Sequence, residues 1–211
     1  MRNSILKYRY EECYAKILLE NLFYDQYQNL FILDKPDLQD INKKVGIEVT
    51  DCTPRKKQEL IANWQKAYFG DAEKIKKKCI ERMKQLGIEY TGGIQFWGSE
   101  TYANDINCSP IKEFLNTVEK KVKKINAGKY ALCEKYDLFV LSEIFIPTEQ
   151  KSEVLNQLAQ INNDLIAYEN IYLSTNENTL IRFNVKLMQI DEKDFENKQR
   201  EYAMIAKDMA K

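Results

Sequence analysis

Two acidic residues stand eleven positions apart in a segment whose pattern brings them together. Asp37 directly follows Pro36, which interrupts a short apolar strand, and Glu48 lies inside Val45–Thr50, a run rich in β-branched residues. A turn between the two segments would pair them as the arms of a hairpin. The pattern therefore predicts that Asp37 and Glu48 point at a common spot.

A carboxylate within an apolar strand is costly to bury unless it is paired or bound to a cation. Ile47 and Val49 would face away from Glu48, because side chains alternate along a strand. Two carboxylates at one spot also disfavour each other's ionisation, and a divalent cation relieves that repulsion. Oxygen ligands suit Mg²⁺ or Mn²⁺, which polarise a phosphate and lower the pKa of a bound water. The predicted chemistry is attack of that water on phosphorus.

The composition excludes several other kinds of catalysis. The 211-residue chain contains no histidine, so it has no Ser-His-Asp triad, Cys-His pair or HExxH zinc site. No Walker A loop occurs, and the five cysteines include no CxxC pair, which favours reduced, mostly buried thiols. With 32 basic and 32 acidic residues, the net charge indicates no particular partner. No apolar run approaches the roughly 18 residues of a membrane span, so we expect a cytoplasmic protein without a membrane partner.

Helices and strands that could position these groups alternate along the chain. Helical spacing of apolar residues predicts helices over 8–24, 54–86 with a break near 69–71, 110–125, 129–135, 149–162 and 194–211. Strands are expected over 29–41, where Lys35-Pro36 interrupts a short apolar strand, and at 45–50, 92–97 and 137–146, and the two arms of a hairpin are expected to flank 175–178. The alternation predicts an α/β or α+β fold. We expect one domain over 1–211, with the helix at 194–211 packing on it.

A helix with a glutamate, a Pro-Asp pair, a hairpin that ends near a glutamate, then a helix and a strand is the arrangement of the PD-(D/E)XK nuclease superfamily. Over residues 8–97 this chain resembles a divergent member. Asp37 matches the motif aspartate and Glu48 the motif glutamate, while Glu20 resembles the extra acid on the first helix of many members. The resemblance implies a restriction-endonuclease-like core, in which helices flank a mixed central sheet.

The same resemblance implies a deoxyribonuclease that depends on Mg²⁺ or Mn²⁺ and, by analogy, a homodimer. Its metal would be held by Glu20, Asp37, Glu48 and the backbone carbonyl of Val49. One position departs from the family pattern, since Thr50 stands where the motif has a lysine that helps to position and activate the attacking water.

A lysine from a neighbouring element could replace the missing one. Lys56 or Lys57, early in the expected helix after Pro54, could reach back to the site, and Lys35 is a further candidate. A lysine ammonium within about 4 Å of the Glu48 carboxylate would favour the enzyme, since that is the reach of an ion pair.

Two other interpretations stay open. The chain could be a binding module for nucleic acid or protein, on a nuclease scaffold that has lost catalysis. It could also be an interaction protein of unrelated α/β fold, if Asp37 and Glu48 lie far apart. The lysine runs 74–78 and 120–124 could be solvated helix faces or could line a groove that follows phosphates.

Overall fold

A computed structural model describes residues 8–42, 44–52, 59, 63, 66–67, 72–85, 110–128, 130–142, 144–175 and 177–210. Its internal contacts divide the chain into two compact units, one made of Met1–Cys52 with Ile106–Lys211 and the other of Thr53–Asp105. The sequence had predicted one domain without an internal boundary. The second unit is inserted between a strand and a helix of the first.

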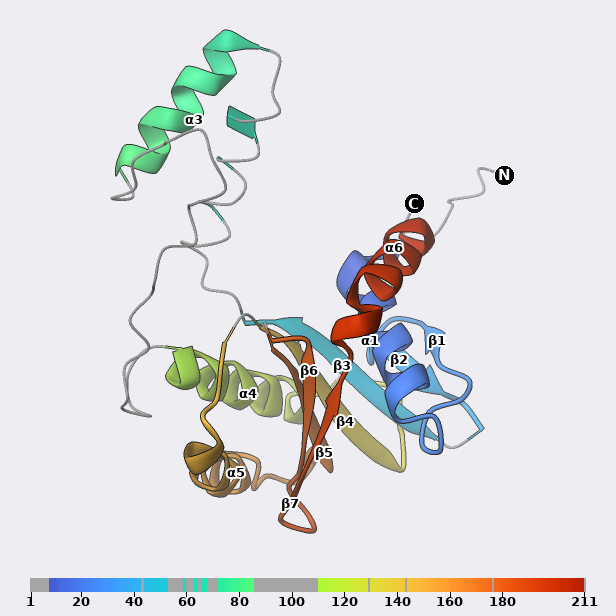
Figure 1. Ribbon diagram of the computed structural model, residues 1–211. Coiled ribbons are helices and arrows are strands. Elements are labelled where there is room, and N and C mark those ends of the chain that lie inside the picture. Colours follow the sequence, from blue (N-terminus) through green and yellow to red (C-terminus); the bar gives the residue numbers. More distant parts are fainter. Residues whose placement is uncertain are drawn as a thin grey trace. The chain divides into compact units, whose positions relative to one another are not determined.

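The first unit is built on a seven-stranded mixed sheet (Figure 1). The strands follow one another in chain order: β1 (Phe31–Ile32), β2 (Leu38–Asp40), β3 (Val45–Asp51), β4 (Lys135–Leu141), β5 (Asn170–Ser174), β6 (Thr179–Asn184) and β7 (Gln189–Asp194). Strand β4 runs parallel to β3 and to β5, and every other neighbouring pair is antiparallel. The prediction of a mixed α/β fold is confirmed.

The described helices of the first unit are α1 (Tyr10–Leu22), α4 (Pro110–Asn126), α5 (Thr148–Ile161) and α6 (Gln199–Met209), with a short 3-10 turn, η2 (Glu196–Lys198), before α6. Pro110 suits the first turn of α4, because its missing N–H has no partner there in any helix. Gly128, with a φ of 84°, adopts the left-handed conformation just after that helix. None of the helices in the described part of the chain has the length and apolar character needed to cross a membrane.

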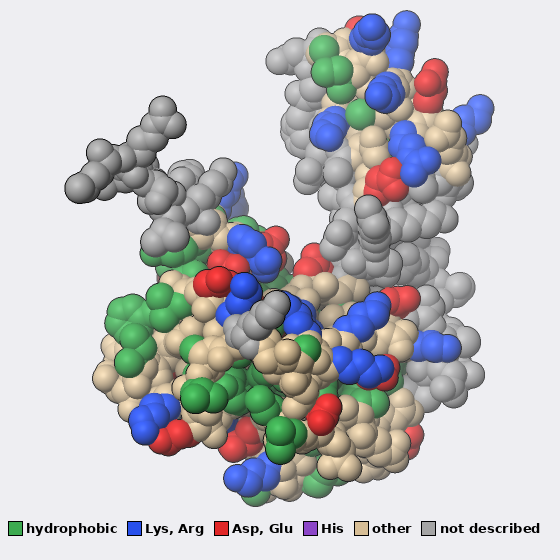
Figure 2. Space-filling view, turned by 180° about the vertical axis from the view of Figure 1, so that it is seen from behind, with side chains coloured by type: hydrophobic (Ala, Val, Ile, Leu, Met, Phe, Trp, Pro, Cys, Tyr) green, Lys and Arg blue, Asp and Glu red, His purple; other side chains and the backbone are tan. Residues whose placement is uncertain are grey.

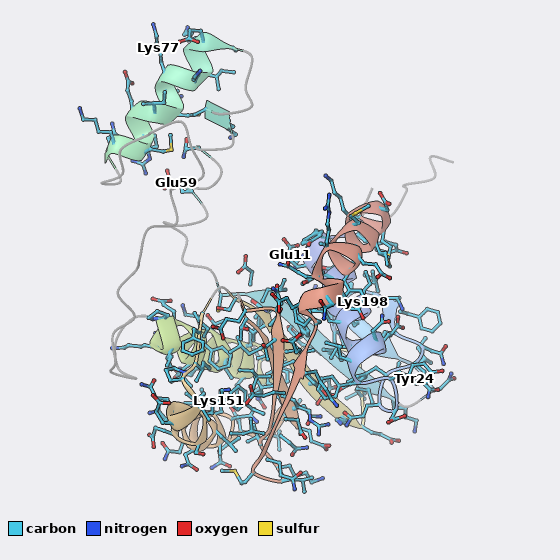
Figure 3. The ribbon with its side chains drawn as sticks, in the orientation of Figure 1. Glu11, Tyr24, Glu59, Lys77, Lys151 and Lys198 are labelled. Atoms are coloured by element: carbon cyan, nitrogen blue, oxygen red, sulfur yellow. The ribbon has the colours of Figure 1, made fainter. Side chains whose placement is uncertain are left out.

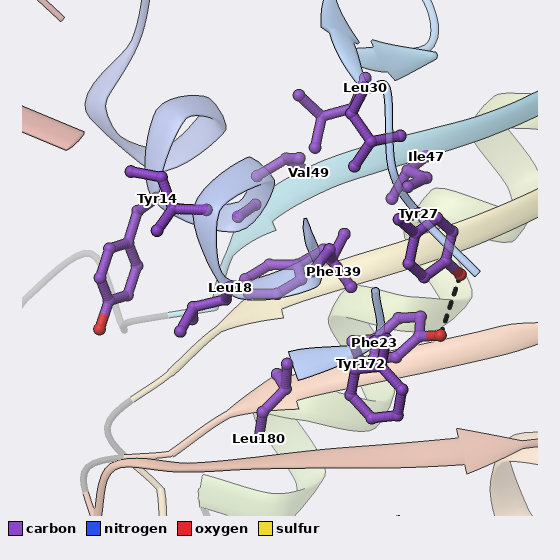
Figure 4. Packing of buried hydrophobic residues seen from close by; sticks show 14 of the residues in the cluster. Tyr14, Leu18, Phe23, Tyr27, Leu30, Ile47, Val49, Phe139, Tyr172 and Leu180 are labelled. Carbon is purple, nitrogen blue, oxygen red and sulfur yellow. Dashed lines mark hydrogen bonds between the residues drawn. The ribbon is translucent and has the colours of Figure 1, made fainter. Parts of the chain in front are cut away.

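One face of the sheet is covered by α1 and α6, which pack against each other. Their buried side chains form an apolar cluster with Ile47 and Val49 of β3. Phe139 of β4 and Tyr172 of β5 extend the cluster along the sheet (Figure 4). Since side chains alternate along a strand, the residue between Ile47 and Val49 points to the other face.

The other face is covered by α4 and α5, each lying in a crossover between parallel strands. Phe114 and Val118 of α4 are buried in a second apolar cluster with Leu138 and Val140 of β4. Glu48 therefore points into the layer between β3 and α4, where it lies 2 % exposed. The fold thus places one carboxylate in an apolar layer, as the sequence predicted.

Several predicted elements differ from those observed. The short helix expected at 129–135 is wrong over its described residues, because 130–134 are irregular and β4 already begins at Lys135. Strand β7 was missed, since its sequence QIDEKD is exposed and polar, as suits the edge of a sheet. The strand expected at 92–97 and most of the helix expected over 54–86 lie outside the described residues, apart from α3 (Glu73–Gln85).

Candidate functional site

Asp37 lies in the turn between β1 and β2 and is attached to β3 by its side chain. Its Oδ2 accepts a hydrogen bond of 2.7 Å from the backbone N–H of Val49. Leu38 stands opposite Ile47 in the antiparallel ladder of β2 and β3, so the Pro-Asp turn is held beside the middle of β3. The structure therefore brings Asp37 and Glu48 together, as the hairpin pattern predicted.

Gly46 permits this close approach. A Cβ at this position would lie 2.5 Å from Cγ of Pro36 and 2.9 Å from Sγ of Cys133. Both distances are well below a van der Waals contact, so the turn could not pack on β3 unchanged. The glycine of the VGIEVT segment is thus a packing requirement of the site.

We expect Gly46→Ala to lower the free energy of unfolding by about 2–3 kcal/mol through overpacking. Gly128→Ala is the matched control, because a Cβ at Gly128 meets nothing within 4 Å and only its positive φ is strained. That strain costs about 1 kcal/mol. Urea unfolding of both variants measures the difference, and equal losses would show that the turn tolerates a side chain at position 46.

Two lysines of α4 converge on one oxygen of Glu48. The ammonium of Lys121 lies 2.7 Å and that of Lys124 2.9 Å from Glu48 Oε1. The Lys121 side chain is 17 % exposed and the Lys124 side chain 53 %. Lys121 Nζ also lies 3.4 Å from the backbone carbonyl oxygen of Val49. Lys121 is therefore the more buried of the two lysines that contact Glu48.

The two carboxylates have opposite pKa shifts. Burial alone raises the pKa of Glu48, but the hydrogen bonds and charges of Lys121 and Lys124 outweigh it and lower the pKa below its ordinary value. Burial and the nearby charge of Glu48 raise the pKa of Asp37, although the Val49 amide and Lys121 oppose them. Glu48 is thus firmly ionised at neutral pH, while Asp37 has an environment that a further cation would stabilise.

Two tyrosines border the lysine pair. The Tyr130 ring lies 5.7 Å, centroid to ammonium, from Lys124, within the range of a cation–π contact. The buried Tyr130 hydroxyl lies close enough to Lys124 to influence the pKa of the lysine. Within the described residues, this hydroxyl makes no hydrogen bond of good geometry. The hydroxyl of Tyr168 donates to the backbone carbonyl of Lys121 at 3.3 Å. These contacts fix the end of α4 over Glu48.

Glu20, the predicted acid of the first helix, has its recorded contacts elsewhere. Its Oε1 accepts hydrogen bonds from the Lys16 ammonium and from the backbone N–H of Leu30, which join α1 to the segment before β1. Glu12, two turns earlier on α1, pairs with Arg9 at 2.9 Å, and its charge only adds to the larger effects of burial and Glu48 that raise the pKa of Asp37. The structure thus brings Asp37 and Glu48 together, whereas the hydrogen bonds of Glu20 are made with Lys16 and Leu30.

The other predicted lysines do not supply the contact to Glu48 in the described structure. Lys56 and Lys57 lie outside the described residues. Lys35 lies 3.6 Å from Asp34, with both side chains at least half exposed. The third interpretation was conditional on Asp37 and Glu48 lying far apart, and that condition is not met, because Asp37 is hydrogen-bonded to the residue that follows Glu48.

The donor set can be tested against a divalent metal. Within the described ranges, no group of three or more Asp, Glu, Cys or His side chains is placed to hold a metal ion. Among the described residues, Asp37 Oδ1 and Glu48 Oε2 accept no hydrogen bond, and the Val49 carbonyl lies 3.4 Å from the Lys121 ammonium that binds Glu48. Two carboxylates and a carbonyl suit Mg²⁺, which usually takes few protein ligands and fills its shell with water and phosphate oxygens. The residues present therefore fit such an ion.

Comparison of this chain with protein-family models, with curated proteins and with solved structures found no match. A function can therefore be inferred only from the residues of the site.

Lys121 could have been found from helical spacing. Lys121 lies three residues after Val118 and four before Ile125, both buried, so it borders the apolar stripe of α4. A lysine at such a border can lay its stem on the core and direct its ammonium to a buried acid. The sequence predicted a solvated face or a phosphate-following groove for 120–124, and neither prediction distinguishes Lys121 from its neighbours.

Proposed function

We propose that this chain is a metal-dependent phosphodiesterase that cleaves nucleic acid, with DNA as the expected substrate. The observation that supports the proposal is the Lys121 ammonium beside Glu48, next to Asp37 and the Val49 carbonyl. Two carboxylates and a lysine are the functional set of the PD-(D/E)XK pattern, and here the lysine comes from α4 instead of the position that Thr50 holds.

Asp37 and Glu48 would hold the ion, together with the Val49 carbonyl. When bound, Mg²⁺ supplies Lewis-acid polarisation of the phosphate and a water of lowered pKa. The Asp37 side chain is oriented by the Val49 amide, and Lys121 keeps Glu48 ionised. The Lys121 ammonium can also stabilise the negative charge that grows on the phosphate oxygens, where a preorganised cation is most effective. Lys124, being half exposed, can contact a neighbouring phosphate.

The experiment is cleavage of supercoiled plasmid and of labelled single-stranded DNA, with Mg²⁺, with Mn²⁺ or with EDTA. We expect cutting with either metal and none with EDTA. Asp37→Asn should lower the rate roughly 100-fold, because a neutral amide holds a divalent ion less well but can still accept the Val49 hydrogen bond. Circular dichroism checks that the variant is folded.

Glu20→Gln is the matched control, because its amide oxygen can still accept from Lys16 and from Leu30. We expect it to cut at the wild-type rate. No cutting by the folded wild type with any metal would contradict the proposal, and so would unaffected cutting by Asp37→Asn.

A second candidate function is a nucleic-acid-binding or protein-binding module without catalysis. It is favoured by the absence of a third acidic ligand among the described residues. On this view the ion pairs only stabilise the packing of α4 on β3. DNA binding without metal-dependent cutting would support this candidate against the first.

A further inference from the structure

The second unit carries a strongly basic helix, α3. Of its thirteen residues six are lysine or arginine and two are glutamate. Only Cys79 and Met83 are buried. Lysine and arginine side chains stand out on the described surface of this unit, at the upper right of Figure 2, and Figure 3 shows Lys77 extending outward from the helix.

Four lysines share one face of α3. At 3.6 residues per turn, Lys74, Lys77, Lys78 and Lys84 lie within about 120° of the helix circumference. All four are exposed, and the face lies opposite Cys79 and Met83. Glu81 is the one acidic side chain on the same face. The helix thus turns its basic side away from the interior of its own unit.

These four lysines are not used in ion pairs within the described residues. Arg82 of the same helix is different, because its guanidinium binds Glu59 at 2.6 Å and Gln85 at 3.2 Å. The lysine face extends from residue 74 to residue 84, about 15 Å along the helix axis. That length matches about four successive phosphates of one DNA strand.

The charge of the chain is unevenly divided between the units. The segment 53–105 contains ten basic and seven acidic residues, a net charge of +3, and the remaining residues contain 22 basic and 25 acidic. The zero net charge of the whole chain conceals this asymmetry. A local excess of positive charge on an exposed helix attracts a polyanion irrespective of the overall charge.

We infer that the Lys74–Lys77–Lys78–Lys84 face of α3 binds the phosphate backbone of nucleic acid, as a second contact beyond the Asp37–Glu48 site. The choice of nucleic acid rests on the proposed function, but the binding itself requires no cleavage. An anionic membrane is the poorer fit, because an interfacial helix needs an exposed apolar side. On α3 that side is occupied by buried Cys79 and Met83, and Ile75 is its one exposed large apolar residue.

The test is fluorescence anisotropy with labelled single-stranded and double-stranded oligonucleotides, in EDTA so that no cutting occurs. The variant is Lys74→Glu/Lys77→Glu/Lys78→Glu. We expect at least a tenfold loss of affinity and a slope of log affinity against log salt that is smaller by about 2–3, because three phosphate contacts are lost. A Lys→Gln triple at the same positions should lose affinity in the same direction, which guards against misfolding caused by added glutamates.

The matched control is Lys186→Glu/Lys193→Glu/Lys207→Glu, which changes the net charge equally at exposed sites of the first unit. It should bind with nearly wild-type affinity. Equal losses in both triple variants, or wild-type binding by the α3 variant, would overturn the inference. Lysine-dependent binding to phosphatidylserine vesicles but not to oligonucleotides would overturn it as well.

Hydrolysis of a small phosphodiester, bis(nitrophenyl) phosphate, separates this inference from the proposed function. The small substrate reaches only the Asp37–Glu48 site, so the α3 variant should hydrolyse it at the wild-type rate. Loss of oligonucleotide binding with intact hydrolysis supports both statements. Lysine-dependent binding by a protein that hydrolyses nothing would leave the inference standing and remove the proposed function.

Discussion

Lys121→Met is expected to lower the rate of metal-dependent DNA cleavage by about 10²–10³-fold, the usual cost of removing one preorganised group that stabilises transition-state charge. Methionine keeps most of the stem that packs beside the apolar stripe of α4, so the loss would be one of charge. Glu48 would keep its ion pair with Lys124, at 2.9 Å, and would stay ionised. The measurement is the initial rate of plasmid nicking with Mg²⁺.

Two variants on the same helix give the comparison. Lys124→Met should lower the nicking rate only about tenfold, because an exposed charge is screened by water. Lys123→Met removes a lysine whose ion pair within the described residues is with Glu119, and it should cut like the wild type. Calorimetric titration with Mn²⁺ should show that Lys121→Met still binds the metal, since the carboxylates are untouched. Wild-type cutting by Lys121→Met would show that its ion pair with Glu48 serves only packing.

Asp137→Ala is expected to lower the free energy of unfolding by about 3–5 kcal/mol, as when one partner of a buried charged network is removed. Asp137 is fully buried at the start of β4. Its Oδ2 accepts from the Tyr27 hydroxyl at 2.6 Å, and its Oδ1 accepts from the backbone and side-chain N–H groups of Asn170 at 2.8 and 3.0 Å. Alanine would leave these donors buried and unpaired.

The network continues from Tyr27 to Tyr172, whose hydroxyls lie 2.9 Å apart (Figure 4). It therefore joins the segment after α1 to β4 and β5 across the sheet. Tyr27→Phe removes only one member and should cost about 1–2 kcal/mol. Urea unfolding at fixed pH compares these variants. If Asp137→Ala lost less free energy of unfolding than Tyr27→Phe, the role of the network would be contradicted.

Asp137→Asn should stay within about 1 kcal/mol of the wild type, because its amide can donate to Tyr27 and its oxygen can accept from Asn170. Burial raises the pKa of Asp137, opposed by Lys135 and by the hydrogen bonds from Tyr27 and Asn170. A raised pKa gives stability that is fully present below the unfolded pKa of about 3.9 and is lost as pH rises through the folded value.

The wild type should therefore lose stability relative to Asp137→Asn as pH rises above about 4. Urea unfolding of both proteins across the acidic range measures this difference, in which the shared titrations of other groups cancel. If the difference in unfolding free energy did not change with pH, or changed in favour of the wild type as pH rises, the folded protein would hold Asp137 ionised.

The sequence by itself determined the elements whose pattern is local. The stripe of α1, the apolar spacing of α4 and the hairpin of β5 and β6 were predicted from neighbouring residues, because helical and strand periodicities repeat within a few positions. The alternation around Glu48 predicted which way its side chain points, and the Pro-Asp turn predicted its neighbour Asp37. Strand β7 was not predicted, because a polar edge strand lacks the apolar alternation that indicates a strand.

Only the tertiary structure decided which distant groups meet. Lys121 reaches Glu48 across 73 residues, and Tyr27 reaches Asp137 across 110. Such contacts depend on the order of strands in the sheet and on the face that each helix covers, which no local period encodes. The same reason explains why Glu20 does not join the pair: in the folded chain its carboxylate binds Lys16 and the backbone N–H of Leu30.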